Sequence, residues 1–347
     1  MMRQSRLLAA VAVIAVAAIS LGACASRHAY SLPDNLRLKI DGRPLVDGPE
    51  ATVLPLAVES LVPIVELQIV GTHGHSSSTR ALVDTGAFMY MALPHAMAEN
   101  ARPWIWQDSI GRVRTWSFGK ESGSLGVMTR VDIGESRLSH VPINVAPKSS
   151  NLPGTILGLS ALSLFDSLEL DWARGSLTLL RHEPGSTASC ADLSTAPGVV
   201  PFRWWHPRGD AAGRENGGVA IGGKVAGSDV ELLVDTGCGG DLVLPRGLAA
   251  KEPWVSALEE DGSINIISAT GTSKARRFKL RRPISIGGES FTDLLVAVFD
   301  DSMLPPGATA LPILGAPVLR RFERVTIDFA NERVILDARL PPAKVRP

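Results

Sequence analysis

Two stretches of this sequence decide its fold, because one repeats the other. Residues 82–87 read Leu-Val-Asp-Thr-Gly-Ala, and residues 233–238 read Leu-Val-Asp-Thr-Gly-Cys. The two aspartates, Asp84 and Asp235, stand 151 positions apart. In each stretch an apolar strand would lead to the aspartate, and the glycine would permit a tight turn close to it. The repetition indicates a duplicated unit that presents one aspartate per copy.

Landmarks downstream of the two aspartates repeat in the same order. Ile-Leu-Gly occurs at residues 156–158 and again at residues 313–315, 157 positions later. Between each aspartate and this landmark, residues 131–134 (Val-Asp-Ile-Gly) parallel residues 284–287 (Ile-Ser-Ile-Gly). The offsets differ by only a few residues, so the sequence predicts two related lobes built from the same succession of strands.

The composition is typical of a folded, mostly β protein with balanced charge. Of the 347 residues, 45% are apolar and 20% are charged, and 33 glycines and 24 prolines separate short apolar runs. The pattern predicts an all-β fold with a few short helices, at residues 94–100, 159–165 and 317–322. Lysine plus arginine and aspartate plus glutamate number 35 each, so no net field favours nucleic acid as a partner.

The N-terminus reads as a targeting segment rather than as part of the fold. A basic start precedes an apolar run at residues 7–19, which is short for a membrane-spanning helix. Leu-Gly-Ala then precedes Cys24, which resembles the lipobox of bacterial lipoproteins. The resemblance implies that residues 1–23 are a signal peptide and that Cys24 carries acyl chains such as palmitate. Ala25 follows where the inner-membrane retention signal has aspartate, so we expect an anchor in the outer membrane, facing the periplasm. An ordinary secretory signal with an incidental cysteine is the alternative.

The mature chain divides at a linker. Residues 184–198 are rich in proline, glycine, serine and threonine and separate the two copies. We therefore expect a lipidated N-terminal arm at residues 24–50, a first lobe at residues 51–183 and a second lobe at residues 199–347. Because both lobes belong to one chain, no second copy is needed to bring the aspartates together, and a monomer is expected.

The two Asp-Thr-Gly stretches and the two Ile-Leu-Gly landmarks together resemble the pepsin and retropepsin class of aspartic proteases. Members of that class have two related β-barrel lobes, and each lobe supplies one Asp-Thr-Gly or Asp-Ser-Gly loop to a shared cleft. In each lobe a hydrophobic-hydrophobic-Gly segment passes beside that loop. The resemblance covers about residues 55–340, and it implies that the active site lies in the cleft between the lobes.

The resemblance implies an aspartic endopeptidase with Asp84 and Asp235 as its catalytic pair. Two neighbouring carboxyl groups cannot both ionise readily, so they share one proton, and this protease class is the standard example of the effect. The ionised member would activate a water that attacks the peptide bond, and the protonated member would donate to its carbonyl oxygen. No metal or other cofactor is needed, and the partner would be a peptide or protein substrate.

In the same resemblance, the residues after each aspartate support the pair. Thr85 and Thr236 would bond the backbone of the opposite loop through their hydroxyl groups. Gly86 and Gly237 would keep both loops thin around the water.

A hairpin from each lobe would cover the substrate. Gly119, in residues 117–119 (Ser-Phe-Gly), and Gly271, in residues 269–271 (Ala-Thr-Gly), are the candidate substrate-binding positions. Trp116 beside the first could cover the cleft or simply pack.

Ala87 and Cys238 depart from the family pattern. Pepsin-like enzymes usually carry serine or threonine here, and its hydroxyl bonds the charged carboxylate. Losing that bond disfavours ionisation, so we predict activity at a milder pH than that of the gastric enzymes. The sequence leaves open whether Cys238 and Cys190 form a disulfide.

Several alternatives stay open. A catalytically silent, protease-like lipoprotein that binds peptides would have an occluded or distorted cleft, and a hydrolase for another amide, such as a cell-wall peptide, would keep the cleft intact. His73 and His75 lack a third metal ligand at a telling spacing, which favours a solvated loop. Residues 203–206 (Arg-Trp-Trp-His) suggest buried aromatic packing, or else a surface for a partner or substrate.

Overall fold

Most of the chain runs in strands, and its helices are short. The computed structural model describes residues 12–13, 44–105, 115–118, 121–150, 152, 154–181, 198–207, 217–268, 271–304 and 310–339. Helices occur at the three predicted places, as α1 (His95–Ala101), α2 (Leu159–Leu162) and α4 (Ala316–Leu319). The other helical segments are α3 (Arg246–Ala249) and the 3-10 turns η2 (Thr72–Gly74), η3 (Pro253–Ala257) and η4 (Asp301–Met303). The prediction of a mostly β fold with few short helices is confirmed.

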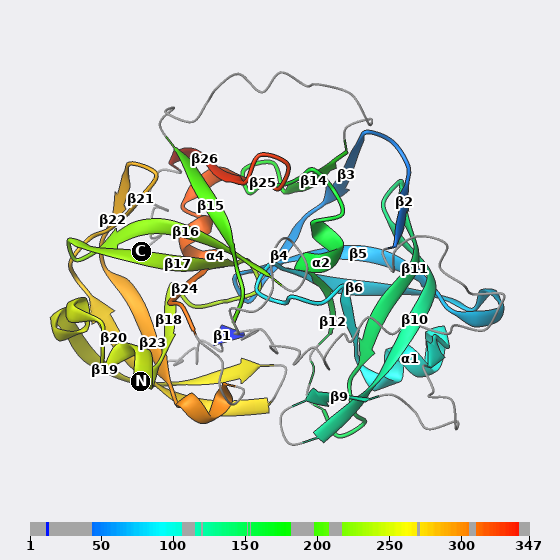
Figure 1. Ribbon diagram of the computed structural model, residues 1–347, viewed down its shortest axis with the longest axis horizontal. Helices are drawn as coiled ribbons and strands as arrows, with labels where there is room; N and C mark the ends of the chain where they lie inside the picture. The colour runs from blue at the N-terminus through cyan, green and yellow to red at the C-terminus, as the bar shows by residue number, and fades with distance from the viewer. Residues whose placement is uncertain are drawn as a thin grey trace, which may run out of the picture.

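The first lobe contains a closed barrel of six strands (Figure 1). Around the ring these are β11 (Ser136–Val145), β7 (Met91–Leu93), β12 (Thr155–Gly158), β6 (Ser76–Asp84), β5 (Val62–Val70) and β10 (Glu121–Ile133). The ring closes because β10 pairs with β5 on one side and with β11 on the other. Shorter strands extend its edges: β2 (Leu45–Asp47), β4 (Ala57–Glu59), β8 (Trp104–Ile105) and β9 (Thr115–Phe118). Strand β2 falls within the segment expected to be an arm and pairs with β11.

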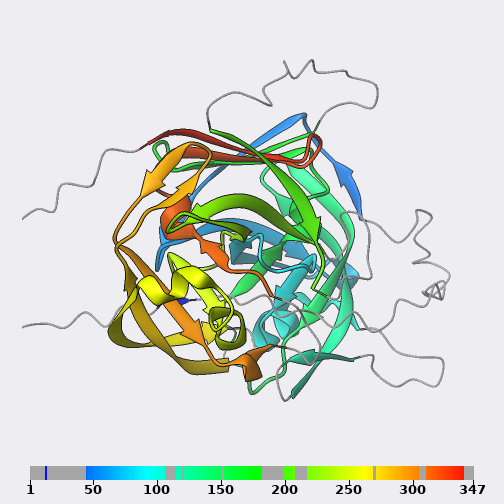
Figure 2. The same cartoon turned by 60° about the vertical axis from the view of Figure 1, so that its left-hand side comes forward.

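The second lobe repeats the order of the first. The equivalents of β11, β7, β12, β6, β5 and β10 are β23 (Leu294–Phe299), β18 (Leu242–Pro245), β24 (Ile313–Gly315), β17 (Ser228–Asp235), β16 (Gly218–Val225) and β20 (Gly271–Leu280). Parallel and antiparallel pairings match at every step between them. Strand β20 ends at Leu280, and the chain continues as β21 (Ile284–Ile286) and β22 (Glu289–Phe291). Strand β21 pairs with β16 and with β22. Figure 2, with this lobe in front, shows these strands curling around its interior.

A long hairpin leaves the second barrel. Strand β19 (Leu258–Ser268) pairs with β20, and β1 (Ala12–Val13) pairs with the outer edge of β19. Charged residues of the hairpin form cross-strand ion pairs, such as Arg276 with Glu260 and Lys279 with Asp261. These pairs neutralise part of the basic charge that the hairpin carries.

A six-stranded antiparallel sheet joins the two lobes along one side of the molecule (Figure 1). Each lobe gives three strands, in the order β15 (Val199–Trp205), β26 (Arg333–Arg339), β25 (Phe322–Asp328), β13 (Ser167–Asp171), β14 (Ser176–Leu180) and β3 (Ala51–Pro55). At its centre Glu169 of β13 lies opposite Thr326 of β25, and these two residues are equivalents in the repeat. The pairing is therefore centred on a local two-fold axis that relates the lobes.

Two repeated aspartates stabilise turns at the ends of these central strands. Asp171 accepts a hydrogen bond from the backbone N–H of Arg174 at 2.8 Å, and Asp328 accepts from that of Asn331 at 3.0 Å. Asp328 also forms an ion pair with Arg333 at 2.8 Å. These contacts give both aspartates a structural role.

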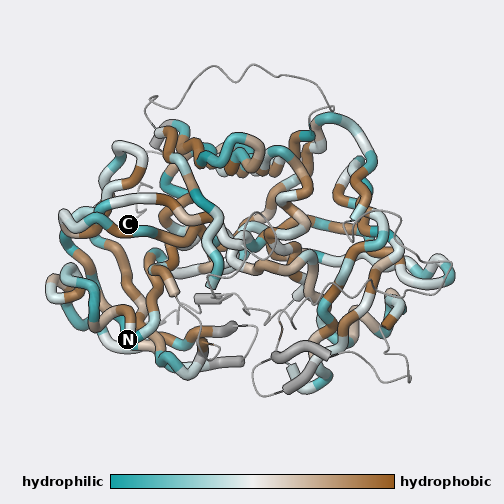
Figure 3. The backbone as a smooth tube through the Cα atoms, in the orientation of Figure 1, coloured by the Kyte–Doolittle hydropathy of each residue, from teal (hydrophilic) through white to brown (hydrophobic). Residues whose placement is uncertain are grey.

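The apolar core runs through both lobes and under the joining sheet. Alternate residues of β5, such as Val65, Leu67 and Ile69, are at most 2% exposed and face the first barrel's interior. Figure 3 shows apolar stretches inside each lobe and hydrophilic stretches at many of the turns. Among the described residues no helix is long and apolar enough to span a membrane.

Candidate active site

Asp84 and Asp235 end two equivalent central strands. Asp84 is the last residue of β6 and Asp235 is the last residue of β17, and both side chains are completely buried. Each strand is apolar just before its aspartate because side chains on both of its faces are buried there. The two strand ends meet at the junction of the lobes, so the duplicated stretches deliver their carboxyl groups to one place.

The Ile-Leu-Gly landmarks run beside these strand ends. Gly158 of β12 lies opposite Asp84, and Gly315 of β24 lies opposite Asp235, in parallel pairings. A Cβ atom at Gly158 would lie 2.2 Å from a carbonyl oxygen of the first aspartate's loop, and one at Gly315 would lie 1.9 Å from a carbonyl oxygen of the second. Only glycine lets the backbone pass so close to each loop.

The two threonines bond the aspartate loops to each other. Thr85 Oγ1 donates to the carbonyl oxygen of Val234 at 2.9 Å and accepts from the backbone N–H of Thr236 at 3.1 Å. Thr236 Oγ1 donates to the carbonyl oxygen of Val83 at 2.6 Å and accepts from the N–H of Thr85 at 3.1 Å. All four bonds cross the lobe boundary and are buried, so they fix the position of one loop relative to the other.

In each carboxyl group, Oδ1 accepts hydrogen bonds from the backbone, and Oδ2 accepts none from the described residues. Asp84 Oδ1 accepts from the N–H groups of Gly86 at 2.9 Å and Ala87 at 3.0 Å, and Asp235 Oδ1 accepts from the N–H of Gly237 at 2.9 Å. The Oδ2 atoms of both aspartates are buried, and no N–H or O–H group of the described residues donates to them. The paired carboxyl groups thus keep two oxygens for another partner.

Burial raises the pKa of both carboxyl groups. Loss of water raises the pKa of Asp84 to about 7, although the neighbouring Asp235 and hydrogen bonds from backbone N–H groups act in the other direction. The pKa of Asp235 is raised well above its usual value, by burial first and by the charge of Asp84 second. Two neighbouring carboxylates repel each other, so ionisation of Asp84 makes ionisation of Asp235 harder. The pair therefore titrates as a unit and retains a proton at neutral pH.

Residues Ala87 and Cys238 give the carboxyl groups no hydroxyl donor. Cys238 is a free cysteine, completely buried, with its Sγ 3.7 Å from the carbonyl oxygen of Gly240. Burial raises the pKa of its thiol, and the nearby charge of Asp235 raises it further. The thiol is therefore protonated and unreactive at neutral pH. Cys190, its candidate disulfide partner, lies outside the described residues.

The candidate hairpins over the cleft are only partly described. Strand β9 includes residues 115–118, and Gly119 lies outside the described residues. Gly271 is the first residue of β20 and pairs with Ser268 of β19, next to the undescribed tip at residues 269–270. In Figure 1 the β9–β10 and β19–β20 hairpins both extend to the side of the molecule opposite the joining sheet. Substrate binding by Gly119 and Gly271 stays a prediction, as does lipidation of Cys24, which is also undescribed.

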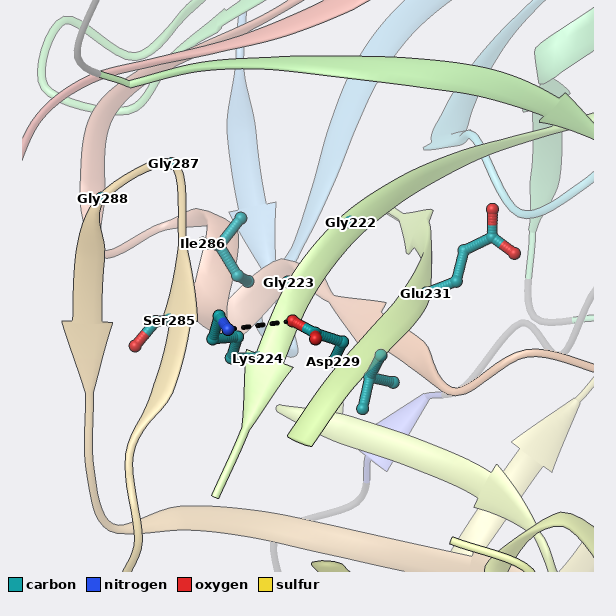
Figure 4. A pocket seen from close by; sticks show the side chains of 10 residues that line it. Gly222, Gly223, Lys224, Asp229, Glu231, Ser285, Ile286, Gly287 and Gly288 are labelled. Carbon is teal, nitrogen blue, oxygen red and sulfur yellow. Dashed lines mark ion pairs between the residues drawn. The ribbon is translucent and has the colours of Figure 1, made fainter. Parts of the chain in front are cut away.

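A surface depression lies on the second lobe, away from the aspartates. Its volume is about 680 Å³, and its floor is formed partly by Gly222 and Gly223 of β16 (Figure 4). The charged groups at its edge neutralise each other, since Lys224 forms an ion pair with Asp229 at 3.1 Å and Glu231 pairs with Arg203.

No group of three or more histidine, cysteine or acidic side chains suited to a metal occurs in the described part of the chain.

The aromatic pair after the linker contacts the first lobe's aspartate loop. Trp205, at the end of β15, is 6% exposed and packs against Phe88, four residues after Asp84, with ring centroids 6.1 Å apart. Trp204 packs instead on Phe202, with centroids 5.3 Å apart. Buried packing, the first reading of residues 203–206, is correct for Trp205. The sequence gives no direct signal for its partner, because Trp205 and Phe88 are far apart in the chain.

A match to a known protein family covers part of the second lobe. Residues 221–318 match the family model described as aspartyl protease. The search of curated proteins found no match. A solved structure that matches is the crystal structure of a retropepsin-like aspartic protease from Rickettsia conorii, at 16% identity, covering 40% of this chain and 94% of that chain, with a TM-score of 0.28. The segment that contains Asp235 and the second Ile-Leu-Gly landmark is thus similar to the aspartyl protease family.

Proposed function

We propose that this chain is an aspartic endopeptidase whose catalytic groups are Asp84 and Asp235. The observation that supports the proposal is the hydrogen bonding of the four carboxyl oxygens. Both Oδ1 atoms accept hydrogen bonds from backbone N–H groups, whereas both Oδ2 atoms are buried and lack a donor within the part of the chain that the structure describes. A structural turn aspartate would instead have its oxygens satisfied, as those of Asp328 are by Asn331 and Arg333.

The reaction follows from one proton shared by two carboxyl groups. The ionised member accepts a proton from a water held between the two Oδ2 atoms, and that water attacks the carbonyl carbon of the peptide bond. The protonated member donates to the carbonyl oxygen, which gives a tetrahedral diol. Transfer of a proton to the leaving nitrogen then breaks the C–N bond and restores the pair. The threonine bonds between the loops and the thin glycines Gly86 and Gly237 hold the geometry in which both oxygens reach the water.

A second candidate is a protease-like lipoprotein that binds peptides without cutting them. Complete burial of Asp84 and Asp235 favours it, because this alternative expects a covered cleft. The matched geometry of the two loops favours the enzyme, because a silent binding protein has no need for paired carboxyl groups that are costly to bury.

The test uses residues 26–347 and the isosteric variants Asp84→Asn and Asp235→Asn. Each protein is incubated with a mixed peptide library and with cell-wall muropeptides, from about pH 4 to about pH 8, with and without a pepstatin-like inhibitor. The proposal expects cleavage by the wild type that the inhibitor blocks and that either variant loses. Cleavage confined to muropeptides would assign the hydrolase to cell-wall amides. Peptide binding without cleavage, unchanged in both variants, would favour the binding protein.

We also propose that the chain is anchored to the outer membrane through acyl chains on Cys24, facing the periplasm. Support comes from the sequence before Cys24. The full-length protein should fractionate with outer membranes, and Cys24→Ser should not incorporate a palmitate label. Equal labelling of the two proteins would leave an ordinary secretory signal as the explanation.

A further inference from the structure

Strand β15 carries the second lobe into contact with the first lobe's aspartate loop. Its first half pairs with β26 in the joining sheet, where Val199 lies opposite Ile335. Its second half pairs with β16 in the second barrel and ends with Trp205 opposite Gly218. The strand therefore changes partners midway and ends beside the loop that follows Asp84.

The contact at this strand end is close and dry. The rings of Trp205 and Phe88 meet edge to face, with centroids 6.1 Å apart and planes at 68°, and the two side chains are 6% and 2% exposed. Gly218 is needed beside them, since a Cβ atom there would lie 2.9 Å from Cε1 of Phe88. The carbonyl oxygen of Phe88 accepts a hydrogen bond from Ser160 Oγ at 2.7 Å. Phe88 is thus held by its ring from one lobe and by its backbone from the other.

The second aspartate loop has no equivalent of this contact. Gly239 and Gly240 follow Cys238 at the positions that Phe88 and Met89 occupy in the first loop. A glycine offers no side chain to an aromatic partner, so the two aspartate loops are supported unequally. Whatever Trp205 contributes, it contributes to the loop of Asp84.

We propose that Trp205 is a positioning residue for Asp84, acting through Phe88. It presses the first aspartate loop against the second lobe and excludes water from the back of that loop. The expected changes in kcat and KM rest on the proposed proteolytic role. The expected change in the ionisation of Asp84 does not. Removing the indole opens space beside Phe88, water enters, and the carboxyl group of Asp84 becomes easier to ionise.

The experiment compares Trp205→Leu with the conservative Trp205→Phe and with a matched control. Trp254→Leu is the control, because Trp254 is also a buried tryptophan of the second lobe, 2% exposed, but lies on η3, which carries neither aspartate. For each protein the pH dependence of kcat and of KM is measured on a peptide that the wild type cleaves. Trp205→Leu should shift the rising limb of the kcat profile toward acid by at least about half a pH unit, with KM changed less than about twofold. Trp205→Phe should keep a profile close to that of the wild type, and Trp254→Leu should lower the melting temperature without any shift.

A second readout keeps the test independent of catalysis. The pH at which stability falls is measured for each tryptophan variant with and without Asp84→Asn, and the difference reports the ionisation of Asp84 in the folded protein. The proposal expects this pH to move toward acid in Trp205→Leu alone. Equal behaviour of Trp205→Leu and Trp254→Leu in this titration would overturn it, whether or not the wild type cleaves peptides. Absence of cleavage together with a shifted titration would instead count against the proteolytic role only.

Discussion

Gly86 of the first lobe faces the carboxyl group of Asp235 in the second lobe, so closely that a Cβ atom at Gly86 would lie 2.3 Å from Cγ of Asp235. The converse holds at Gly237, where a Cβ atom would lie 2.4 Å from Cγ of Asp84. Each carboxyl group therefore packs on the glycine of the other loop. The approach of the two carboxyl groups depends on the absence of two Cβ atoms, which gives these glycines a role that a turn alone would not require.

The first prediction concerns this close approach. Gly86→Ala should force the two aspartates apart and lower kcat on the order of 100-fold, because small displacements of reacting groups have effects of that size. The matched control is Gly222→Ala, since a Cβ atom at Gly222 meets nothing within 4 Å. Peptide cleavage and melting temperature are measured for both. Nearly normal cleavage by a folded Gly86→Ala protein would contradict the described geometry.

The second prediction concerns the threonine bonds between the loops. Thr85→Val keeps the shape of the side chain but leaves the carbonyl of Val234 and the N–H of Thr236 buried without partners. We expect a loss of about 2–4 kcal/mol in the free energy of unfolding, measured by denaturant titration. Thr85→Ser keeps the hydroxyl group and should lose less than half as much. If serine and valine destabilise the protein equally, the hydroxyl bonds are not what holds the loops.

The third prediction follows from the raised pKa of Asp84. The pKa is about 7 in the folded protein and about 3.9 in an unfolded chain. Between these values the folded state keeps a proton that the unfolded state releases. The stabilisation is therefore complete below about pH 4 and is lost as the pH rises through about 7, by roughly 4 kcal/mol. Asp235, whose pKa is also raised, acts in the same direction.

Denaturant titrations from about pH 4 to about pH 8 check this prediction. The wild type should lose stability across the range, and Asp84→Asn should flatten the curve. Asp241 also has a raised pKa, from burial, and acts in the same direction, so the contribution of Asp84 is read from the difference between the wild type and Asp84→Asn. Asp261 and Asp300 have lowered pKa values, from the neighbouring Lys279 and Ser302 respectively, so their contributions change below about pH 4. A wild type that gains stability from about pH 5 to about pH 7 would show that the pair is not protonated.

The fourth prediction concerns the missing hydroxyl beside the pair. Wild-type activity should rise toward neutral pH, because the first ionisation of the buried pair is shifted upward. Cys238→Ser supplies a stronger donor close to Asp235 and should shift the rising limb of the pH–rate profile toward acid by about one unit. The companion variant Cys238→Ala lacks a donor and should leave the limb in place. An activity maximum in strong acid for the wild type would refute the explanation.

Local sequence was sufficient for the repeat, for the strand ends and for both aspartates. Apolar runs that end in Asp-Thr-Gly can be recognised directly in the sequence. The landmark glycines Gly158 and Gly315 repeat 157 positions apart. Even the interruption between β20 and β21 agrees with the sequence, because Pro283 precedes the segment that parallels residues 131–134. These features depend on neighbours in the chain, which is why a sequence reveals them.

Contacts across the lobe boundary could not be predicted in the same way. The partner of Trp205 lies in the other lobe, and a tryptophan has many ways to be buried. The pairing of β2 with β11 could not be predicted either, because three residues are too few to show which strand they join. The hairpin tips are a further case, since glycine, serine and threonine residues indicate a turn but not what it covers.

The pairing of Glu169 with Thr326 has a consequence for the history of the chain. In a symmetric homodimer, a strand on the two-fold axis meets its own copy, so a single residue type must be compatible with itself at the centre. The joining sheet has the geometry of such a subunit interface, now inside one polypeptide. Fusion removes the constraint, and a glutamate can face a threonine where identical subunits would place glutamate against glutamate. Because the two lobes can differ in sequence, one aspartate loop carries Phe88 and the other carries Gly239. Two identical subunits could not differ in this way.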